Sequence, residues 1–405
     1  MFFCVALIAG SLAGLSLLNQ PQDNNKQSTS AVTTTAVAAV ALRHGFDLPP
    51  PNETRYVKNE VLLDIPTHVP DATLDRIAAR HATTRLETVK VNATGRTLHR
   101  WRIDSSRSVR QAIMRLSREQ IISGAGPNYL YTLEQDSPGF LSNDHYAPRK
   151  LQLSDVHRIA TGDGVLIALI DTKVDAAHRD LAGVIAENIE LLDAQSKPHA
   201  HATGMAGAIA GVAPRARLLA IHVFAINKSS TLELIRAVDL ATQRGARIIN
   251  MSFGGPHDPR LRDTLAAASR QGIILIAAAG NGGAKSPPQF PGAYPNVIAV
   301  TATDVADRLF KHANRGNYIA VAAPGVDVFA PAPGDAYQLS TGTSIAAAEV
   351  SGVAALVIER NPSLKPAAVR KILMDTAKDL GPKGHDRDYG AGLVNVPQAL
   401  DWSGR

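Results

Sequence analysis

The chain has 405 residues, of which 45% are hydrophobic and 19% are charged, an ordinary globular balance with room for roughly two or three domains. Its net charge of +6 is spread along the sequence without a block of like charges, which argues against a nucleic-acid-binding protein. The only cysteine is Cys4, so no intramolecular disulfide is possible.

The first segment, residues 1–19, is almost wholly apolar but is marginal in length for a membrane span. We interpret it as a signal sequence, which predicts a secreted or periplasmic protein without further membrane contact. No Lys or Arg precedes it, so a misassigned start codon and an uncleaved anchor remain alternatives. Residues 20–54, rich in Gln, Asn, Ser, Thr, Ala and Pro, are typical of a flexible linker.

Residues 55–135 combine short strand and helix patterns. We expect strands at 60–65, 99–103 and 129–132, a helix at 71–80 capped by Asp71, and a helix at 108–118. These elements predict a small α+β domain. Pro and Gly mark residues 136–149 as a second linker.

Residues 150–405 alternate buried strands with helices. The expected strands cover 165–170, 218–223, 247–251, 273–278 and 297–300. The expected helices cover 202–209, 232–243, 260–270, 344–359 and 366–377. This alternation predicts an α/β fold with a doubly wound, mainly parallel sheet, whose functional residues should follow the carboxyl ends of the strands.

Four polar residues stand at the end of a strand or at the start of a helix in this pattern. Asp171 ends a strand, His201 opens a helix of small residues, Ser344 opens a long apolar helix, and Asn281 ends another strand. Each one alone is explained by a turn or a helix cap. A serine at a helix N-terminus is also suited to nucleophilic catalysis, because free N–H groups there can stabilise an oxyanion.

In chain order, the segments 165–175, 201–207, 250–254, 278–281 and 342–346 resemble motifs of the subtilisin-like serine proteases, or subtilases. The order Asp, His, Ser is that of subtilisin and not that of chymotrypsin or the α/β-hydrolases. A third hypothesis, an esterase on another α/β scaffold, is excluded because no Gly-x-Ser-x-Gly motif occurs. The resemblance covers roughly residues 145–400.

The resemblance implies a role for each residue. Ser344 would attack the scissile carbonyl, His201 would act as general base and acid, and Asp171 would orient the imidazole. Asn281 and the backbone N–H of Ser344 would form the oxyanion hole. The implied substrate-binding residues are Ser252, Phe253, Gly254, Ala279 and Gly280.

Residues 55–135 resemble the propeptide of the family. The resemblance implies a zymogen that cuts itself between about Tyr129 and Tyr146, with this domain as a partner in cis and polypeptides as substrates. No cofactor is required for such catalysis. We expect no metal at the site, because His199 and His201 lack a third ligand. The family's common calcium loop is also expected to be absent, because residues 210–214 leave no room for it.

Several residues depart from the family pattern. Lys173 replaces a common Gly, Ala202 replaces the Gly after the histidine, and Ala348 with Glu349 replaces the usual Pro and its neighbour. A positive φ at Lys173 or Ala202 would cost about 1–2 kcal/mol. The alternative function is therefore a weak or inactive pseudoprotease that binds extended peptides.

Overall fold

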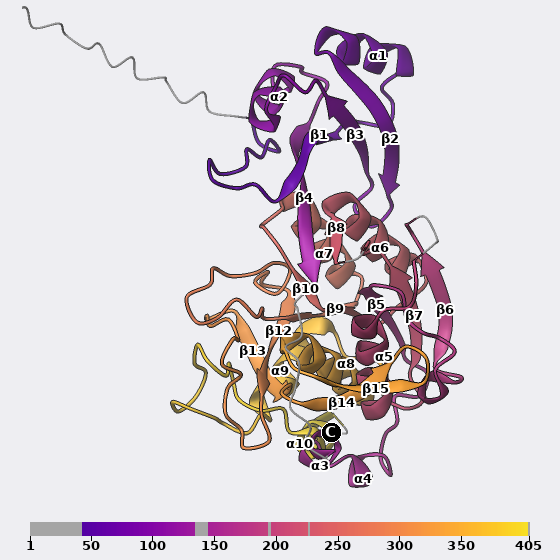
Figure 1. The fold of residues 1–405 in the computed structure, drawn as a ribbon, viewed down its shortest axis with the longest axis vertical. Helices are drawn as coiled ribbons and strands as arrows, with labels where there is room; N and C mark the ends of the chain where they lie inside the picture. The colour runs from indigo at the N-terminus through magenta and orange to yellow at the C-terminus, as the bar shows by residue number, and fades with distance from the viewer. Residues whose placement is uncertain (1–42, 134–144, 193–195, 226, 404–405) are drawn as a thin grey trace, which may run out of the picture. The chain divides into compact units, whose positions relative to one another are not determined.

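The computed structural model describes residues 43–133, 145–192, 196–225 and 227–403 (Figure 1). The expected signal sequence at 1–19 and most of the linker expected at 20–54 lie outside these residues. Residues 42–405 form one compact unit. Within the described ranges, no helix is long and apolar enough to span a membrane.

The N-terminal domain is an antiparallel sheet with two helices on one face (Figure 1). Its elements are β1 (Tyr56–Asp64), α1 (Asp71–Arg80), β2 (Thr83–Val91), β3 (Arg96–Ile103), α2 (Val109–Leu116) and β4 (Gly124–Leu133). Side chains alternate along β1: Val61 and Leu63 belong to the core under the helices, whereas Leu62 belongs to a core of the second domain. The sheet therefore contributes to both cores.

Some expectations for this region are wrong. Asp71 does not cap α1, because the N-cap is Pro70 and the carboxylate of Asp71 pairs with Arg85 instead. Part of the linker expected at 20–54 is packed, since Phe46 and Leu48 lie against the N-terminal core. Strand β2 was not predicted, because its side chains are largely polar and only Val91 is fully buried.

The second domain contains a seven-stranded sheet in which all paired neighbours are parallel, as the sequence predicts. In spatial order its strands are β13 (Ile319–Pro324), β12 (Val297–Thr303), β11 (Ile274–Ala278), β9 (Ile248–Met251), β5 (Leu166–Asp171), β7 (Arg217–His222) and β6 (Ile185–Glu190). Ile167 and Leu169 face one core, and Ala168 and Ile170 face the other. The doubly wound fold class is confirmed.

Helices cover both faces of this sheet. Helices α5 (Ala200–Val212), α8 (Thr343–Arg360), α9 (Pro366–Asp375) and α10 (Val396–Ser403) contribute to one core, and α6 (Thr231–Gln243) and α7 (Pro259–Arg270) to the other. The short elements are α3 (Tyr146–Lys150), α4 (Leu153–Val156), a 3-10 turn (Arg179–Leu181), β8 (Lys228–Ser230), β10 (Phe253–Gly254), β14 (Val328–Ala332) and β15 (Ala336–Ser340). Helix α3 begins inside the segment 136–149 that was expected to be a linker.

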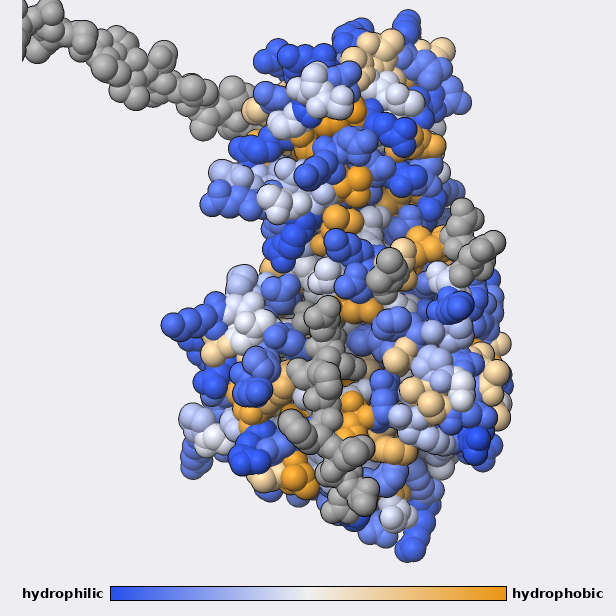
Figure 2. All heavy atoms as spheres, viewed as in Figure 1, coloured by the Kyte–Doolittle hydropathy of each residue, from blue (hydrophilic) through white to orange (hydrophobic). Residues whose placement is uncertain are grey.

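The two domains are joined by strand β4. It pairs antiparallel with β1 in its own domain and with β8 and β10 of the second domain. Polar contacts add to this junction: the carboxylate of Asp239 on α6 accepts hydrogen bonds from Asn92 Nδ2 at 3.1 Å and Ala93 N at 2.7 Å. Figure 2 shows a mainly hydrophilic surface on the face in view, with apolar residues in small separate areas.

Candidate active site

Asp171 lies at the carboxyl end of β5 and is fully buried. Its Oδ1 accepts hydrogen bonds from Thr172 N at 2.6 Å and Thr172 Oγ1 at 3.0 Å, and it lies 2.9 Å from Nδ1 of His201. These contacts fix the carboxylate and assign the imidazole proton to Nδ1, so that Nε2 is the basic nitrogen of neutral His201. The sequence did not indicate the role of Thr172.

His201 occupies the first turn of α5. The N-cap of this helix is His199, whose Nδ1 accepts a hydrogen bond from the backbone N–H of His201 at 3.1 Å. His201 is 6% exposed, and Ala202 beside it is fully buried. The helix start therefore holds the imidazole against the end of β5.

Ser344 is the second residue of α8, whose N-cap is Gly342. The simple explanation of Ser344 as a helix cap is therefore excluded. Its Oγ donates to the carbonyl of Ser252 at 3.3 Å, and Ser252 Oγ donates to the carbonyl of Ser344 at 3.1 Å. Because Ile170 pairs with Met251, Asp171 and Ser252 end neighbouring strands at the same edge of the sheet. This is the edge at which ligands bind in such folds.

Asn281 follows β11 and is tied to the start of α8. Its Oδ1 accepts hydrogen bonds from Thr343 N at 3.0 Å and Thr343 Oγ1 at 2.9 Å. The amide is thereby oriented, with its nitrogen directed away from Thr343. Thr343 Oγ1 also accepts from Gly280 N at 3.1 Å, so one threonine organises both segments. No pattern in the sequence indicated this role of Thr343.

Gly280 also meets a steric requirement. It has a φ of +113°, and a Cβ there would lie 2.5 Å from Asn314 Nδ2. Neighbouring Ala279 is fully buried, and its carbonyl accepts a hydrogen bond from Tyr318 at 2.7 Å. The expected pocket residues thus lie directly beside the Asn281 segment.

The expected substrate strand is occupied in this chain by β4. Phe253 pairs with Leu133 and Gly254 pairs with Thr132, while β8 pairs with the other edge of β4. The ring of Tyr131 is buried edge-on against Phe253, with 6.3 Å between ring centroids. A Cβ at Gly255 would lie 2.4 Å from Tyr131 Cδ1, so glycine makes room for this ring. Strand β4 thus already occupies the edge at which a substrate strand is expected to pair.

The departures from the family pattern cause no backbone strain. Neither Lys173 nor Ala202 has a positive φ, so the cost considered for them does not arise. Lys173 forms an ion pair with Glu190. Ala348 is fully buried within α8, and burial raises the pKa of neighbouring Glu349 well above its usual value.

The described residues hold no group of three or more His, Cys, Asp and Glu that could bind an ion. In His199 and His201, both Nδ1 atoms contact protein groups. Helix α5 ends at Val212. The expected absence of the family's calcium loop after this helix stays a prediction.

Comparison with known proteins identifies the class. The subtilase family matches residues 162–392. The chain is 32% identical to thermitase of Thermoactinomyces vulgaris over 278 residues, 65% of this chain and 98% of the relative. It is 35% identical to subtilisin DY of Bacillus licheniformis over 253 residues, 59% of this chain and 91% of the relative.

A solved structure shares the fold. Fervidolysin from Fervidobacterium pennivorans, described as a keratinolytic enzyme related to subtilisin, matches with a TM-score of 0.75 at 22% identity. The match covers 87% of this chain and 62% of that chain. The fold is therefore subtilisin-like. The chain belongs to the subtilase family of serine endopeptidases, as its motifs predict.

Proposed function

We propose that this chain is a secreted serine endopeptidase, made as a self-processing precursor, in which Asp171, His201 and Ser344 form the catalytic triad. The observation that carries the proposal is the 2.9 Å contact between His201 Nδ1 and Asp171 Oδ1, at the sheet edge where Ser344 begins a helix. Membership of the subtilase family supports the reaction class.

The chemistry follows from these positions. Ser344 Oγ attacks the scissile carbonyl while Nε2 of His201 accepts its proton, and buried Asp171 stabilises the imidazolium that forms. The Asn281 amide and the N–H of Ser344 at the start of α8 stabilise the oxyanion. His201 then gives the proton to the leaving amine, and water hydrolyses the acyl-enzyme.

The N-terminal domain acts as an inhibitor in cis. Strand β4 pairs with Phe253 and Gly254, where a substrate would add as a strand, and its last described residue is Leu133. Because β4 leads into the expected substrate position, self-cleavage falls most simply just after this strand, within the interval between Tyr129 and Tyr146. The three residues proposed as the triad are buried in this precursor form, which fits an enzyme that is inactive before processing.

Labelling of Ser344 with a fluorophosphonate tests the catalytic proposal, because only an activated serine reacts. The mature protein should be labelled and should hydrolyse unstructured protein substrates, whereas Ser344→Ala should do neither. Asp171→Asn should retain the fold but lower kcat by about 10⁴-fold. A folded, matured chain that binds peptides without labelling would instead identify the pseudoprotease.

Maturation provides a separate test. The intact chain should be converted to a shorter form whose N-terminus, read by mass spectrometry, lies between Tyr129 and Tyr146. Ser344→Ala should accumulate as the uncut precursor when no other protease is present. The Ser344→Ala chain also tests secretion. If residues 1–19 are a cleaved signal sequence, the Ser344→Ala protein found outside the cell should lack them.

A further inference from the structure

His199 lies two residues before His201 and begins α5, although histidine is not among the residues preferred at a helix N-cap. Its Nδ1 accepts the backbone N–H of His201 at 3.1 Å. Its own N–H donates to the carbonyl of Lys173 at 2.8 Å, and its carbonyl accepts from Thr203 Oγ1 at 2.9 Å. His199 therefore connects the segment after Asp171 to the helix turn that carries His201.

Only the neutral form of His199 can make the cap. An imidazolium carries N–H groups on both ring nitrogens, so its Nδ1 cannot accept a hydrogen bond. A cation at this point would also face the positive end of the helix dipole. Partial burial and the neighbouring His201 lower the pKa of His199, against an opposite effect of Asp171.

The groups around His199 come from several elements. His201 lies on its own helix, and Asp171 lies at the end of β5. The segment after β5 contributes Lys173, whose charge is paired with Glu190 of β6. From β15, the neutral amide of Gln338 donates to the Ala200 carbonyl in the same helix turn at 2.8 Å. Charge at His199 therefore acts chiefly on the Asp171–His201 pair.

We propose that His199 is a positioning residue for His201. In its neutral form it holds the first turn of α5, so that His201 keeps its contact with Asp171, and its protonation releases that turn and slows catalysis. The inference rests on the proposed function, because it takes His201 as the catalytic base. It gives the His-x-His pair a role that needs no metal ion.

The test compares mature wild-type enzyme with His199→Asn and His199→Ala, using kcat and KM across pH. Asn offers an acceptor oxygen at the cap but does not titrate in this range. In wild type, acid should lower kcat/KM by about three- to ten-fold beyond the loss due to the catalytic base, in the pH range below the ordinary histidine value of 6.5 where His199 becomes charged. In His199→Asn this additional loss should be absent.

His199→Ala should lower kcat about three- to ten-fold at neutral pH, with KM nearly unchanged, because the cap is lost while the substrate strands remain. His199→Asn should restore kcat there. His312→Asn, which changes another exposed histidine outside any helix cap, should match wild type throughout.

Two results would overturn the proposal: an additional acid loss of kcat/KM that persists in His199→Asn, or a wild-type kcat in His199→Ala. A failure of the proposed function is seen separately, because wild-type enzyme would then neither hydrolyse substrate nor react with fluorophosphonate. Thermal melting of each variant shows whether a lower kcat reflects unfolding instead of positioning.

Discussion

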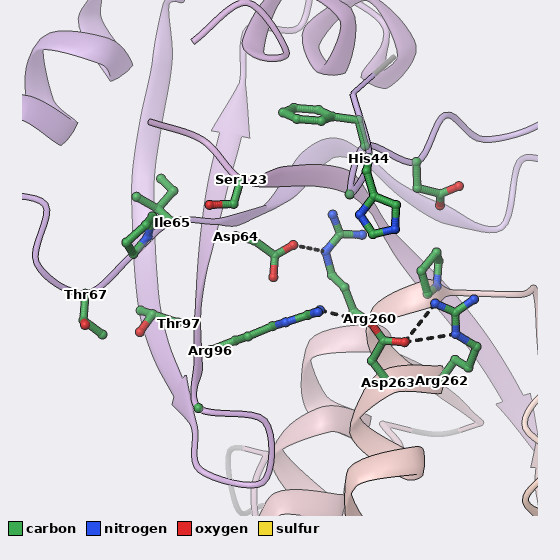
Figure 3. A pocket seen from close by; sticks show the side chains of 16 residues that line it. His44, Asp64, Ile65, Thr67, Arg96, Thr97, Ser123, Arg260, Arg262 and Asp263 are labelled. Atoms are coloured by element: carbon green, nitrogen blue, oxygen red, sulfur yellow. Dashed lines mark hydrogen bonds and ion pairs between the residues drawn. The ribbon is translucent and has the colours of Figure 1, made fainter. Parts of the chain in front are cut away.

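Asp64 at the end of β1 and Arg260 in the first turn of α7 form an ion pair between the two domains, with 3.2 Å between Oδ2 and Nε. Figure 3 shows the two side chains meeting. Both line a cavity of about 660 Å³. Arg260 is 4% exposed. A Cβ at Gly126 on β4 would lie 2.4 Å from Arg260 Nη1, so a glycine in this strand makes room for the guanidinium.

This pair should contribute strongly to the attachment of the N-terminal domain. Asp64→Asn, made in the full chain with Ser344→Ala to prevent processing, should lower the free energy of unfolding of that domain by about 3 kcal/mol, because Arg260 stays buried without its partner. Trp101, buried in the N-terminal core, reports this unfolding by fluorescence in urea.

The matched control is the more exposed pair between Arg96 and Asp263, which crosses the same junction at 3.1 Å. Asp263→Asn should cost less than about 1 kcal/mol, because solvent screens exposed ion pairs. Equal costs for the two substitutions would show that burial of Arg260 does not govern the attachment.

Glu349 should make stability depend on pH. It is buried in α8, its Oε2 has no hydrogen-bond partner among the described residues, and burial raises its pKa well above 4.5. The folded protein thus keeps this proton at pH values where the unfolded chain has lost it. Stability from Glu349 is fully present below pH 4.5 and is lost as pH rises through the folded pKa.

Glu349→Gln removes this titration while preserving the size of the side chain. The melting temperature of Glu349→Gln relative to its parent, in the Ser344→Ala chain, should therefore increase from pH 5 toward alkaline pH, in the window set by the raised pKa. Glu187→Gln on the surface strand β6 controls for loss of a charge alone. A difference that stays constant with pH would mean that Glu349 is ionised in the folded protein.

Gly255 should set the size of side chain accepted at the substrate position equivalent to Tyr131. In the mature enzyme, the space beside Phe253 that the Tyr131 ring fills should accept an aromatic residue of the substrate. Gly255→Ala should lower kcat/KM at least about ten-fold for peptides with Tyr there, and much less for peptides with Ala, since the added methyl overlaps the ring. Paired peptides measured on the same enzyme give the comparison directly, and an equal loss for both would contradict it.

The sequence predicted the central strands and helices well because they are apolar and periodic. It placed the helix at residues 71–80 at its observed bounds, and it predicted the strands that lead to Asp171 and Asn281. Strands β2 and β6 were missed because they lie at sheet edges, where polar side chains hide the pattern.

The proposed site residues were identified from motifs in chain order, whereas the residues that orient them are recognised only from tertiary contacts. Thr343 orients Asn281 across a separation of 62 positions in the chain, which no local pattern can indicate. His199 was noticed only as a possible metal ligand, because its role as a cap depends on the backbone direction at the start of α5. Pairing of β4 with β10 likewise joins segments far apart in the sequence.

Lys173 is the departure that bears most directly on the choice between an active enzyme and a pseudoprotease. Its backbone φ is not positive, and its ammonium group, with 23% of the side chain exposed, pairs with Glu190. Replacing it by the glycine common in the family should therefore leave kcat/KM within about two-fold. It should lower stability by about 1–2 kcal/mol, from greater backbone entropy in the unfolded chain and loss of the ion pair.

Lys173→Ala separates these contributions, because it removes the ion pair without the added freedom of glycine. Its loss of stability, measured by urea unfolding, should be smaller than that of Lys173→Gly, with the same kcat/KM. A large gain of activity in Lys173→Gly alone would mean that the active site needs the conformational freedom of glycine at this position. The wild-type lysine would then be the residue that limits catalysis, and the pseudoprotease alternative would gain its first direct support.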